Sequence, residues 1–530
     1  MNRTTLSLLA AATALAAVTG IAALTAPAAG DTVTASAPAR LPVERTSLLC
    51  PAPSVSDVAE TTYTSFTPAG TAGGDAEGSA ELKKAVAAPA GTETGDDEKD
   101  DDKKNGDKKN GGKDTGKDTG KGGKAKKPPA PDAPFAALKE PGKPVAAEAS
   151  GADAPALVGT ATGRLAPGWT AQQTTTVSVG GARGLLGMSC SAPDTNFWFP
   201  GASTGESRQD YVHLTNPDDT AAVADIELYG KDGVLKTEVG EGIPVPARSS
   251  VPVLLSTLTS EAADNVTVHV TTRSGRVGAV VHAADDKAGS DWLAASADPA
   301  SRVVLPGIPA DATDVRLVVY APGQDDADLK VQLAGATGTI TPAGFETLHV
   351  KSGMTAALDL ADVTKGEGGS LVLSPVQSGR STPVVAALRV VRGKGDKQEI
   401  AFIPATAPIG SRATVADNRA KGSTLSLTAP GATATVKVTA SAGTGGGEPV
   451  EKTYTVKAGT TLAFTPPVPE GLKGSYALTV EPRSGGPVHA ARTLVLPADG
   501  ISMFTVQTLP DDRGMVSVPK AKEDLSILAD

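Results

Sequence analysis

A repeat of about 105 residues constrains the fold of this chain more than any other feature of its sequence. Landmarks recur in the same order three times, beginning with a strand that ends in an apolar residue and Pro. The first landmark falls at Phe199-Pro200, Leu305-Pro306 and Ile403-Pro404, and a turn with Pro follows at Asn216-Pro217, Ala321-Pro322 and Ala429-Pro430. A period of this length is too long for a solenoid or a propeller blade and suits a β-sandwich.

The stretch 211–233, YVHLTNPDDTAAVADIELYGKDG, shows the local pattern of one repeat. Apolar and polar residues alternate on both sides of Asn216-Pro217, which predicts two strands that each bury one face. Ala224, Ile226 and Leu228 form the inward set of the second strand. Asn, Pro and Asp between the strands are typical of a tight turn. The stretch therefore predicts a β-hairpin of an antiparallel sheet.

The last landmark is a Ser-Gly turn that leads into an apolar strand. It occurs at Ser274-Gly275, Ser378-Gly379 and Ser484-Gly485. Pro and Gly interrupt the chain at short intervals, and no stretch of the body indicates a long helix. We therefore predict an all-β fold with three tandem immunoglobulin-like β-sandwich domains, preceded by an N-terminal signal or anchor helix and a disordered charged loop.

The repeats and the changes in composition together define seven predicted regions. They are a signal peptide or membrane anchor (1–30), an N-terminal segment with strands that join the first β domain (31–70), a disordered charged loop (71–154), three β-sandwich domains (155–300, 301–402 and 403–510) and a C-terminal tail (511–530).

The centre of region 71–154 is rich in Asp, Lys, Gly and Asn and contains almost no apolar residue. Such a segment cannot bury enough surface to offset the entropy lost on ordering. Asp101, Asn105 and Gly106 resemble part of a calcium-binding loop, but Lys103 falls where a ligand oxygen is required. A solvated tether is the favoured interpretation.

The N-terminus indicates export. Arg3 precedes the uncharged segment 6–24, and Ala26-Pro27-Ala28 fits a small-x-small cleavage site. The same apolar run is long enough to span a bilayer once if it is not cleaved. Cleavage and anchoring stay open as alternatives, and both place the body of the protein outside the cytoplasm, either secreted or membrane-anchored.

Cys50 and Cys190 are the two cysteines of the chain, and in an exported protein they predict one disulfide. Each follows a short apolar segment, so we expect the two to lie on neighbouring strands. The segment 31–70 would then complete the first domain, and the charged tract would project from it as a loop.

Composition excludes some functions. A net charge of −10 and a pI near 5.2 argue against nucleic-acid binding, which needs a basic patch. Aromatic residues make up 3% of the chain, which is few for stacking platforms. No cofactor is expected.

Candidate catalytic residues are scattered. Acidic pairs such as Asp218-Asp219 fall in predicted turns, where Asp is common for structural reasons. Five histidines, Asp291 and several serines lack the context of an activated nucleophile. His269 and His282 could approach each other, but two imidazoles alone make a poor zinc site.

Trp198 and Trp292 are the candidate ligand contacts. Trp198 lies in the aromatic cluster 197–199 and could stack on a sugar. The competing interpretation packs Trp198 in the core of the first domain near the sulfur of Cys190.

Several of these motifs support a resemblance to a known family. Cys190, the Phe-Trp-Phe cluster, 214–217 (LTNP) and 229–233 (YGKDG) resemble exported actinobacterial proteins catalogued only as a domain of unknown function. The resemblance covers about Cys50 to the C-terminus without the charged tract. It implies a single N-terminal membrane segment and a β-rich body facing the envelope, with no established activity.

The sequence thus predicts a non-catalytic scaffold or interaction protein of the cell envelope. The alternative is a cell-wall carbohydrate-binding module or a degenerate glycan-acting enzyme that uses Trp198 and nearby acids. Expected partners are an envelope protein or a cell-wall polysaccharide, and the membrane if the N-terminal segment is retained. No nucleic-acid partner is expected.

Overall fold

The structure is a computed structural model that describes residues 38–70, 77–87, 133–377, 379, 381–498 and 500–519. Two compact units divide the chain, one made of 1–41 with 516–530 and one made of 42–515. In the first unit, β1 (Ala39–Pro42) pairs with β39 (Met515–Val518). All that follows concerns the second unit.

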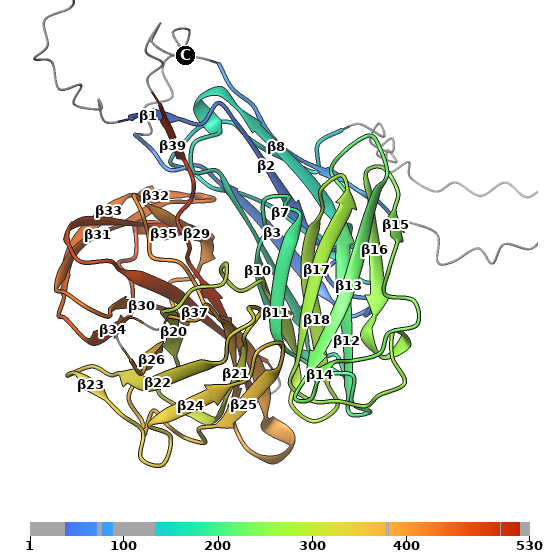
Figure 1. Cartoon of the computed structure of the whole chain (residues 1–530). Coiled ribbons are helices and arrows are strands. Elements are labelled where there is room, and N and C mark those ends of the chain that lie inside the picture. The colour runs from blue at the N-terminus through green and yellow to red at the C-terminus, as the bar shows by residue number, and fades with distance from the viewer. Residues whose placement is uncertain are drawn as a thin grey trace, which may run out of the picture. The chain divides into compact units, whose positions relative to one another are not determined.

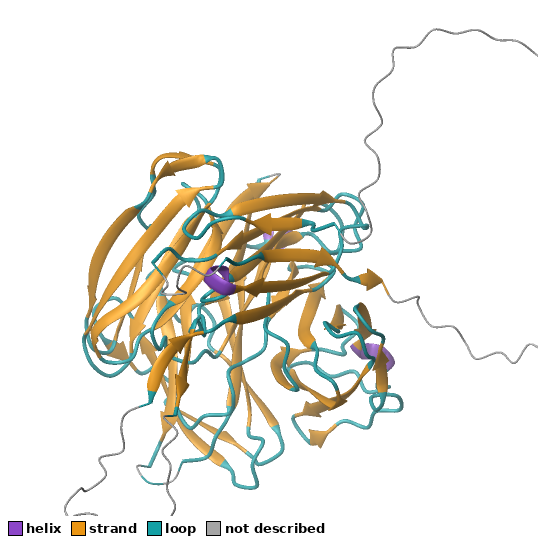
Figure 2. Ribbon diagram, turned by 90° about the horizontal axis from the view of Figure 1, so that it is seen from above, coloured by secondary structure: helices purple, strands orange, loops and turns teal. Residues whose placement is uncertain are grey.

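The described residues form an all-β fold, as predicted, and their helices are single 3-10 turns of three residues (Figures 1 and 2). These turns are η1 (Gly163–Leu165), η2 (Leu255–Thr257) and η3 (Gly395–Lys397). The predicted N-terminal helix lies outside the described residues.

Eight sheets of the second unit combine into four sheet pairs, each built around a buried core. Pair 1 contains β2 (Arg45–Cys50), β3 (Glu60–Phe66), β4 (Ala80–Lys84), β6 (Ala136–Leu138), β7 (Val145–Ser150), β8 (Leu157–Thr162), β9 (Thr170–Val177) and β10 (Gly184–Ser189). Its two sheets have the orders β2-β8-β4-β6 and β10-β9-β3-β7.

Pair 2 has the sheets β11-β17-β13-β14, joined by β15, and β19-β18-β12-β16. Its strands are β11 (Asn196–Ala202), β12 (Arg208–Thr215), β13 (Ala222–Gly230), β14 (Gly233–Val234), β15 (Ile243–Val245), β16 (Ser249–Leu254), β17 (Val266–Ser274), β18 (Gly278–Asp285) and β19 (Gly289–Leu293). A short strand from the first pair, β5 (Val86–Ala87), adds to the free edge of β16 in parallel.

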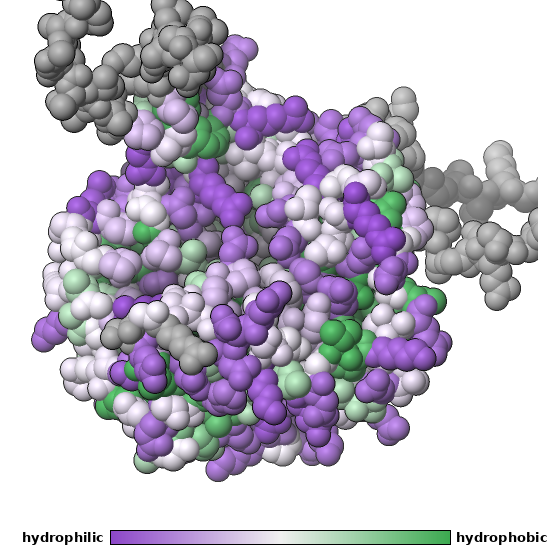
Figure 3. Space-filling view, in the orientation of Figure 1, coloured by the Kyte–Doolittle hydropathy of each residue, from purple (hydrophilic) through white to green (hydrophobic). Residues whose placement is uncertain are grey.

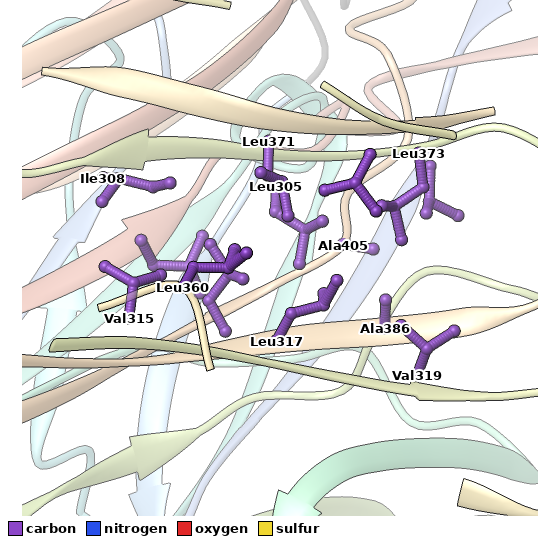
Figure 4. Close-up of a cluster of buried hydrophobic side chains, with 14 of the residues drawn as sticks. Leu305, Ile308, Val315, Leu317, Val319, Leu360, Leu371, Leu373, Ala386 and Ala405 are labelled. Carbon is purple, nitrogen blue, oxygen red and sulfur yellow. The ribbon is translucent and has the colours of Figure 1, made fainter. Parts of the chain in front are cut away.

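Pair 3 has the sheets β20-β26-β22-β23, joined by β24, and β25-β21-β27-β28. Its strands are β20 (Val303–Ile308), β21 (Ala312–Tyr320), β22 (Ala327–Ala334), β23 (Thr339–Ile340), β24 (Thr347–Val350), β25 (Thr355–Asp359), β26 (Gly369–Pro375), β27 (Val385–Arg392) and β28 (Glu399–Pro404). Leucine, isoleucine, valine and alanine from both sheets fill the space between them (Figure 4).

Pair 4 has the sheets β29-β36-β31-β33 and β34-β30-β37-β38. Its strands are β29 (Ala413–Asn418), β30 (Ser423–Ala429), β31 (Ala434–Gly443), β33 (Val450–Val456), β34 (Thr460–Phe464), β36 (Tyr476–Gly485), β37 (His489–Ala498) and β38 (Ile501–Thr508). A separate two-stranded sheet of β32 (Gly446–Glu448) and β35 (Glu470–Lys473) adjoins it.

All four pairs share one topology. If the seven main strands of each pair are lettered A to G in chain order, one sheet contains A-E-C and the other contains G-F-B-D. In an immunoglobulin constant domain the corresponding sheets are ABED and CFG. The shared features are therefore two packed sheets and about seven strands, and the strand pairing differs.

This topology corrects the predicted hairpin at 211–233. The strands before and after Asn216-Pro217 are β12 and β13, and they lie in opposite sheets. The inward set of β13 is buried as predicted, and Asn216 shapes the turn by donating to the carbonyl oxygens of Thr220 and Val245 at 2.8 and 3.0 Å. Alternation specifies which face of a strand is buried, but it does not specify the neighbouring strand.

A second correction concerns Ile403-Pro404, which was predicted to open the third repeat. These residues end β28, which pairs with β27 as the last strand of pair 3. The strand that corresponds to β11 and β20 is β29, and all three contain a bulge. The boundary predicted between 402 and 403 therefore falls within a strand.

A third correction concerns the region 71–154, which was predicted to be a disordered loop. β4, β5, β6 and β7 lie within it, and pair 1 makes a fourth copy of the repeated topology. Alternating Ala80 and Leu82 are buried, as are Ala136 and Leu138. Residues 88–132, which include most of the charged tract, lie outside the described residues.

The predicted disulfide between Cys50 and Cys190 is present. Cys50 ends β2, and Cys190 directly follows β10. β2 and β10 belong to the two sheets of pair 1, so the bond joins these sheets, and both cysteines are part of the buried core. Next to the bond the two segments are neighbours as predicted, because Leu49 and Ser191 form an antiparallel bridge with N–H···O distances of 2.8 and 3.1 Å.

The four G strands contact one another in a closed cycle. β10 contacts β19, β19 contacts β28, β28 contacts β38, and β38 contacts β10. The cores of pairs 2 and 3 are each completed by side chains from the F and G strands of the next pair. These side chains are Ala387, Ile400 and Phe402 in the core of pair 2, and Ala491, Phe504 and Val506 in the core of pair 3.

Candidate functional site

Buried polar and titratable side chains gather where the G strands meet. Asp291 on β19 accepts hydrogen bonds from the backbone N–H of Gly187 at 3.2 Å and from Thr505 Oγ1 at 2.9 Å. It thereby connects the G strands of pairs 1, 2 and 4. Burial raises the pKa of Asp291 well above its usual range, although these hydrogen bonds oppose the shift.

An ion pair connects pair 1 to pair 3. Arg183, in the turn before β10, donates through Nε to Glu399 Oε1 at 3.2 Å. The guanidinium also donates to the backbone oxygens of Gln398 and Lys287 at 2.8 and 3.0 Å. Burial raises the pKa of Glu399 to about 7, with Arg183 acting in the opposite direction.

A second ion pair lies on β12 of pair 2, where it packs against pair 3. Arg208 donates to both carboxylate oxygens of Asp210, at 3.0 and 2.7 Å, and both side chains are buried. Its guanidinium lies over the ring of Phe402, 5.7 Å from the centroid. Burial raises the pKa of Asp210 to about 6 despite the adjacent arginine.

Two histidines and a tryptophan lie together on the outer face of pair 2. The ring centroids of His213 and His282 are 5.3 and 5.0 Å from that of Trp292. Trp292 packs in one buried cluster with Leu186 and Met188 of pair 1. Burial lowers the pKa of His213 to about 3 and that of His282 to about 4, so both imidazoles are neutral at pH 7.

These histidines predict a loss of stability in mild acid. The unfolded chain takes up protons at His213 and His282 near pH 6.5, whereas the folded chain does so only near pH 3 and 4. The two neutral imidazoles therefore contribute fully to the free energy of unfolding above pH 6.5, and this contribution is lost as the pH falls toward 4. In thermal unfolding from pH 7 to 4, we expect the His282→Gln variant to lose less stability than the wild type.

The exposed His349, replaced by Gln, serves as the control and should follow the wild type. The raised pKa values of Asp210, Asp291 and Glu399 favour the folded state as the pH falls, which opposes the effect of the histidines. The histidine contribution is therefore measured as the difference in stability between the wild type and each variant. A difference in stability between the wild type and His282→Gln that stays the same from pH 7 to 4 would contradict a role for His282 in the loss of stability in acid.

The aromatic cluster around Trp198 lies between pairs 2 and 3. The Trp198 ring stacks on His269 with centroids 3.6 Å apart and lies 5.4 Å from the ring of Tyr320 in pair 3. His269 contacts Glu227 through Nδ1 and Asn196 through Nε2, both at 2.9 Å. Burial lowers the pKa of His269, and Glu227 opposes this shift.

The structure does not bring the two candidate ligand contacts together. Trp198 is 7% exposed and packs against pair 3, whereas Trp292 is 3% exposed and packs against pair 1. The prediction of Trp198 near the sulfur of Cys190 is also wrong, because Cys190 belongs to the core of pair 1. In that core, Trp169 takes the place expected for Trp198.

The hollows found on the described part of the chain do not include these residues. One of about 20 Å³ lies between Asp326, Asp328 and Pro375 in pair 3. A wider one of about 300 Å³ is lined by 409–410 and 482–487 in pair 4.

Within the described ranges, no three His, Cys, Asp or Glu side chains are grouped so that they could hold a metal ion. No helix of the described part is long and apolar enough to cross a membrane. The segment 6–24 and the calcium-like residues near Asp101 lie outside these ranges.

Sequence reasoning missed most of the buried charges. Asp291 was considered only as a nominal partner for a serine and a histidine, and Arg208, Asp210 and Glu399 were not considered. A charged residue at an inward position of an alternating strand is the sequence pattern that indicates such a buried charge. Arg492 in the segment HAARTLVL is the clearest case, because its neighbours on the same face are apolar.

The fold and this junction define a class of protein: an all-β chain of repeated sheet pairs whose titratable side chains are buried between the pairs. A family model described as a family of unknown function (DUF5719) matches residues 145–467. The match covers more than half of the chain, which therefore belongs to this family. No curated protein and no solved structure matches the chain.

Proposed function

We propose that this chain is a non-catalytic scaffold or interaction protein of the cell envelope, built from tandem β-sandwich domains. One observation carries the proposal: the side chains best suited to chemistry are used in contacts between sheet pairs. Asp291 and Glu399 are buried and bond to partners from other pairs. Asp210 is buried and paired with Arg208 of the same strand, whose guanidinium lies over Phe402 of pair 3.

A general acid or base must reach the proton that it transfers, directly or through one water molecule. Raised pKa values are often found at active sites, but buried structural ion pairs also produce them. At this junction the raised values arise from burial among packed strands, away from both hollows. Their geometry favours a role in holding the pairs together.

An extracytoplasmic location fits the same proposal. A buried disulfide that joins two sheets is typical of proteins that fold in an oxidising compartment. The N-terminal run of uncharged residues would supply the export signal or the membrane anchor.

The alternative of carbohydrate binding requires aromatic faces that a sugar ring can reach. Trp198 and Trp292 do not offer such faces, because both are buried between sheet pairs. On the face shown in Figure 3, hydrophobic residues occur in small patches separated by hydrophilic ones. That surface gives no single apolar platform for a polysaccharide.

A polysaccharide array combined with in-cell crosslinking tests the proposed function. We expect the purified chain to bind no cell-wall polysaccharide above the level of a denatured control, and we expect crosslinking to recover a defined envelope protein. Saturable binding to one polysaccharide that is competed by its soluble oligosaccharide would overturn the scaffold proposal. Release of new reducing ends from that polysaccharide would support a glycan-acting enzyme instead.

A further inference from the structure

Pair 4 contains an arginine at a position where pairs 2 and 3 have apolar residues. Arg492 lies on β37 opposite Leu425 of β30. The equivalent F-strand positions are Val281, opposite Val212 in pair 2, and Leu388, opposite Leu317 in pair 3. Both of these belong to apolar cores. Arg492 has no exposed surface, so its charged side chain is buried as completely as the apolar side chains of Val281 and Leu388.

The guanidinium of Arg492 is only partly satisfied. Its Nη1 donates to the backbone oxygen of Asp417 at 3.5 Å, whereas Nε and Nη2 have no hydrogen-bond partner within the described ranges. The hydroxyl of Tyr476 also lacks a partner there and is fully buried. Unpartnered donors in a protein interior cost free energy, and charged donors cost the most.

The charges around Arg492 do not balance. Asp417 is fully buried, and its carboxylate lies 2.8 Å from Arg419. The groups that act on Arg492 are Asp417, Arg419 and Tyr476, so two guanidinium groups share one carboxylate. Apart from the ion pair with Arg419, the two carboxylate oxygens of Asp417 have no hydrogen-bond partner within the described ranges. Burial lowers the pKa of Arg492 to about 10, which still leaves it charged at pH 7. A small anion would compensate the excess charge and accept the free N–H groups.

We propose that pair 4 binds a monovalent inorganic anion of the chloride class at Arg492, with Nε and Nη2 as donors. The backbone at this place is also unusual. Asp417 has a φ of 56° at the bulge of β29, a conformation that residues other than glycine rarely adopt. This bulge brings the Asp417 carbonyl oxygen toward the guanidinium. The proposal does not depend on the proposed function.

Thermal unfolding of the full chain in sodium bromide and in sodium gluconate at equal ionic strength tests the site. A halide that binds only the folded state raises the melting temperature with concentration, whereas gluconate is too large to enter the core. We expect a saturable increase of several degrees in bromide. The increase should disappear in Arg492→Leu, which places in pair 4 the residue that pair 3 has at this position.

Arg483→Leu is the matched control, because Arg483 is an exposed arginine of the same pair and should leave the halide effect unchanged. Anomalous diffraction from bromide-soaked crystals gives a readout that does not depend on any variant. A bromide peak within hydrogen-bond distance of Arg492 Nε or Nη2 would support the site. Water alone at that position, or equal melting temperatures in both salts, would overturn it.

Discussion

Replacing both Cys50 and Cys190 by alanine is expected to lower the free energy of unfolding by about 2–5 kcal/mol. The two residues are separated by 140 positions, so the bond closes a long loop and removes many conformations from the unfolded chain. Urea unfolding of the oxidised wild type and of the double variant measures the difference.

Reduced wild-type protein is the matched control, since it keeps both sulfur atoms but lacks the bond. A drop in stability on reduction that matches the drop in the double variant assigns the effect to the bond rather than to lost packing. Alkylation of both thiols in protein purified without reductant would contradict the presence of the bond. Equal stability of the oxidised and reduced forms would contradict its contribution.

Local features of the strands could be predicted from the sequence. The inward positions of β13 follow strict alternation and are buried as expected, and β22 and β31 repeat this alternation of buried and more exposed residues. Asn216-Pro217 falls between β12 and β13, and Ser484-Gly485 ends β36 just before the turn to β37. Asn, Pro and Gly adopt turn conformations at low cost. These features depend on residues that are close in sequence.

The pairing of strands could not be predicted in the same way. The turn at Asn216 connects two strands in either a hairpin or a crossing between sheets, and its sequence is compatible with both. The choice depends on β16 and β18, which take the positions next to β12. Pair 1 was missed for a related reason, since the charged tract separates β4 from β6 and hides the repeat.

The candidate site was the least predictable part. Trp198 and Trp292 look like ligand contacts when the chain is considered one domain at a time, because each lies on the outer face of its own pair. They become buried when the next or the preceding pair packs against that face. Burial at the junction depends on contacts between distant segments, and local alternation carries no information about them.

Replacing Phe402 by alanine is expected to destabilise the chain by about 3–5 kcal/mol, the usual cost for a buried phenylalanine. Phe402 belongs to β28 of pair 3, yet it is 1% exposed within the core of pair 2. The substitution leaves a cavity there and also removes the ring beneath Arg208. Because Arg208 and Asp210 are buried beside it, the surrounding structure has little freedom to close the gap.

Hydrogen exchange distinguishes a shared core from two independent ones. In the Phe402→Ala variant we expect backbone amides of β12 and β17 in pair 2 to lose protection together with those of β27 in pair 3. Phe464→Ala is the control, because Phe464 is only partly buried and stacks on Tyr454 inside pair 4. That variant should leave the protection of pair 2 unchanged. If Phe402→Ala weakens β27 while β12 and β17 keep their protection, the pairs fold independently and the closed cycle of G strands does not couple them.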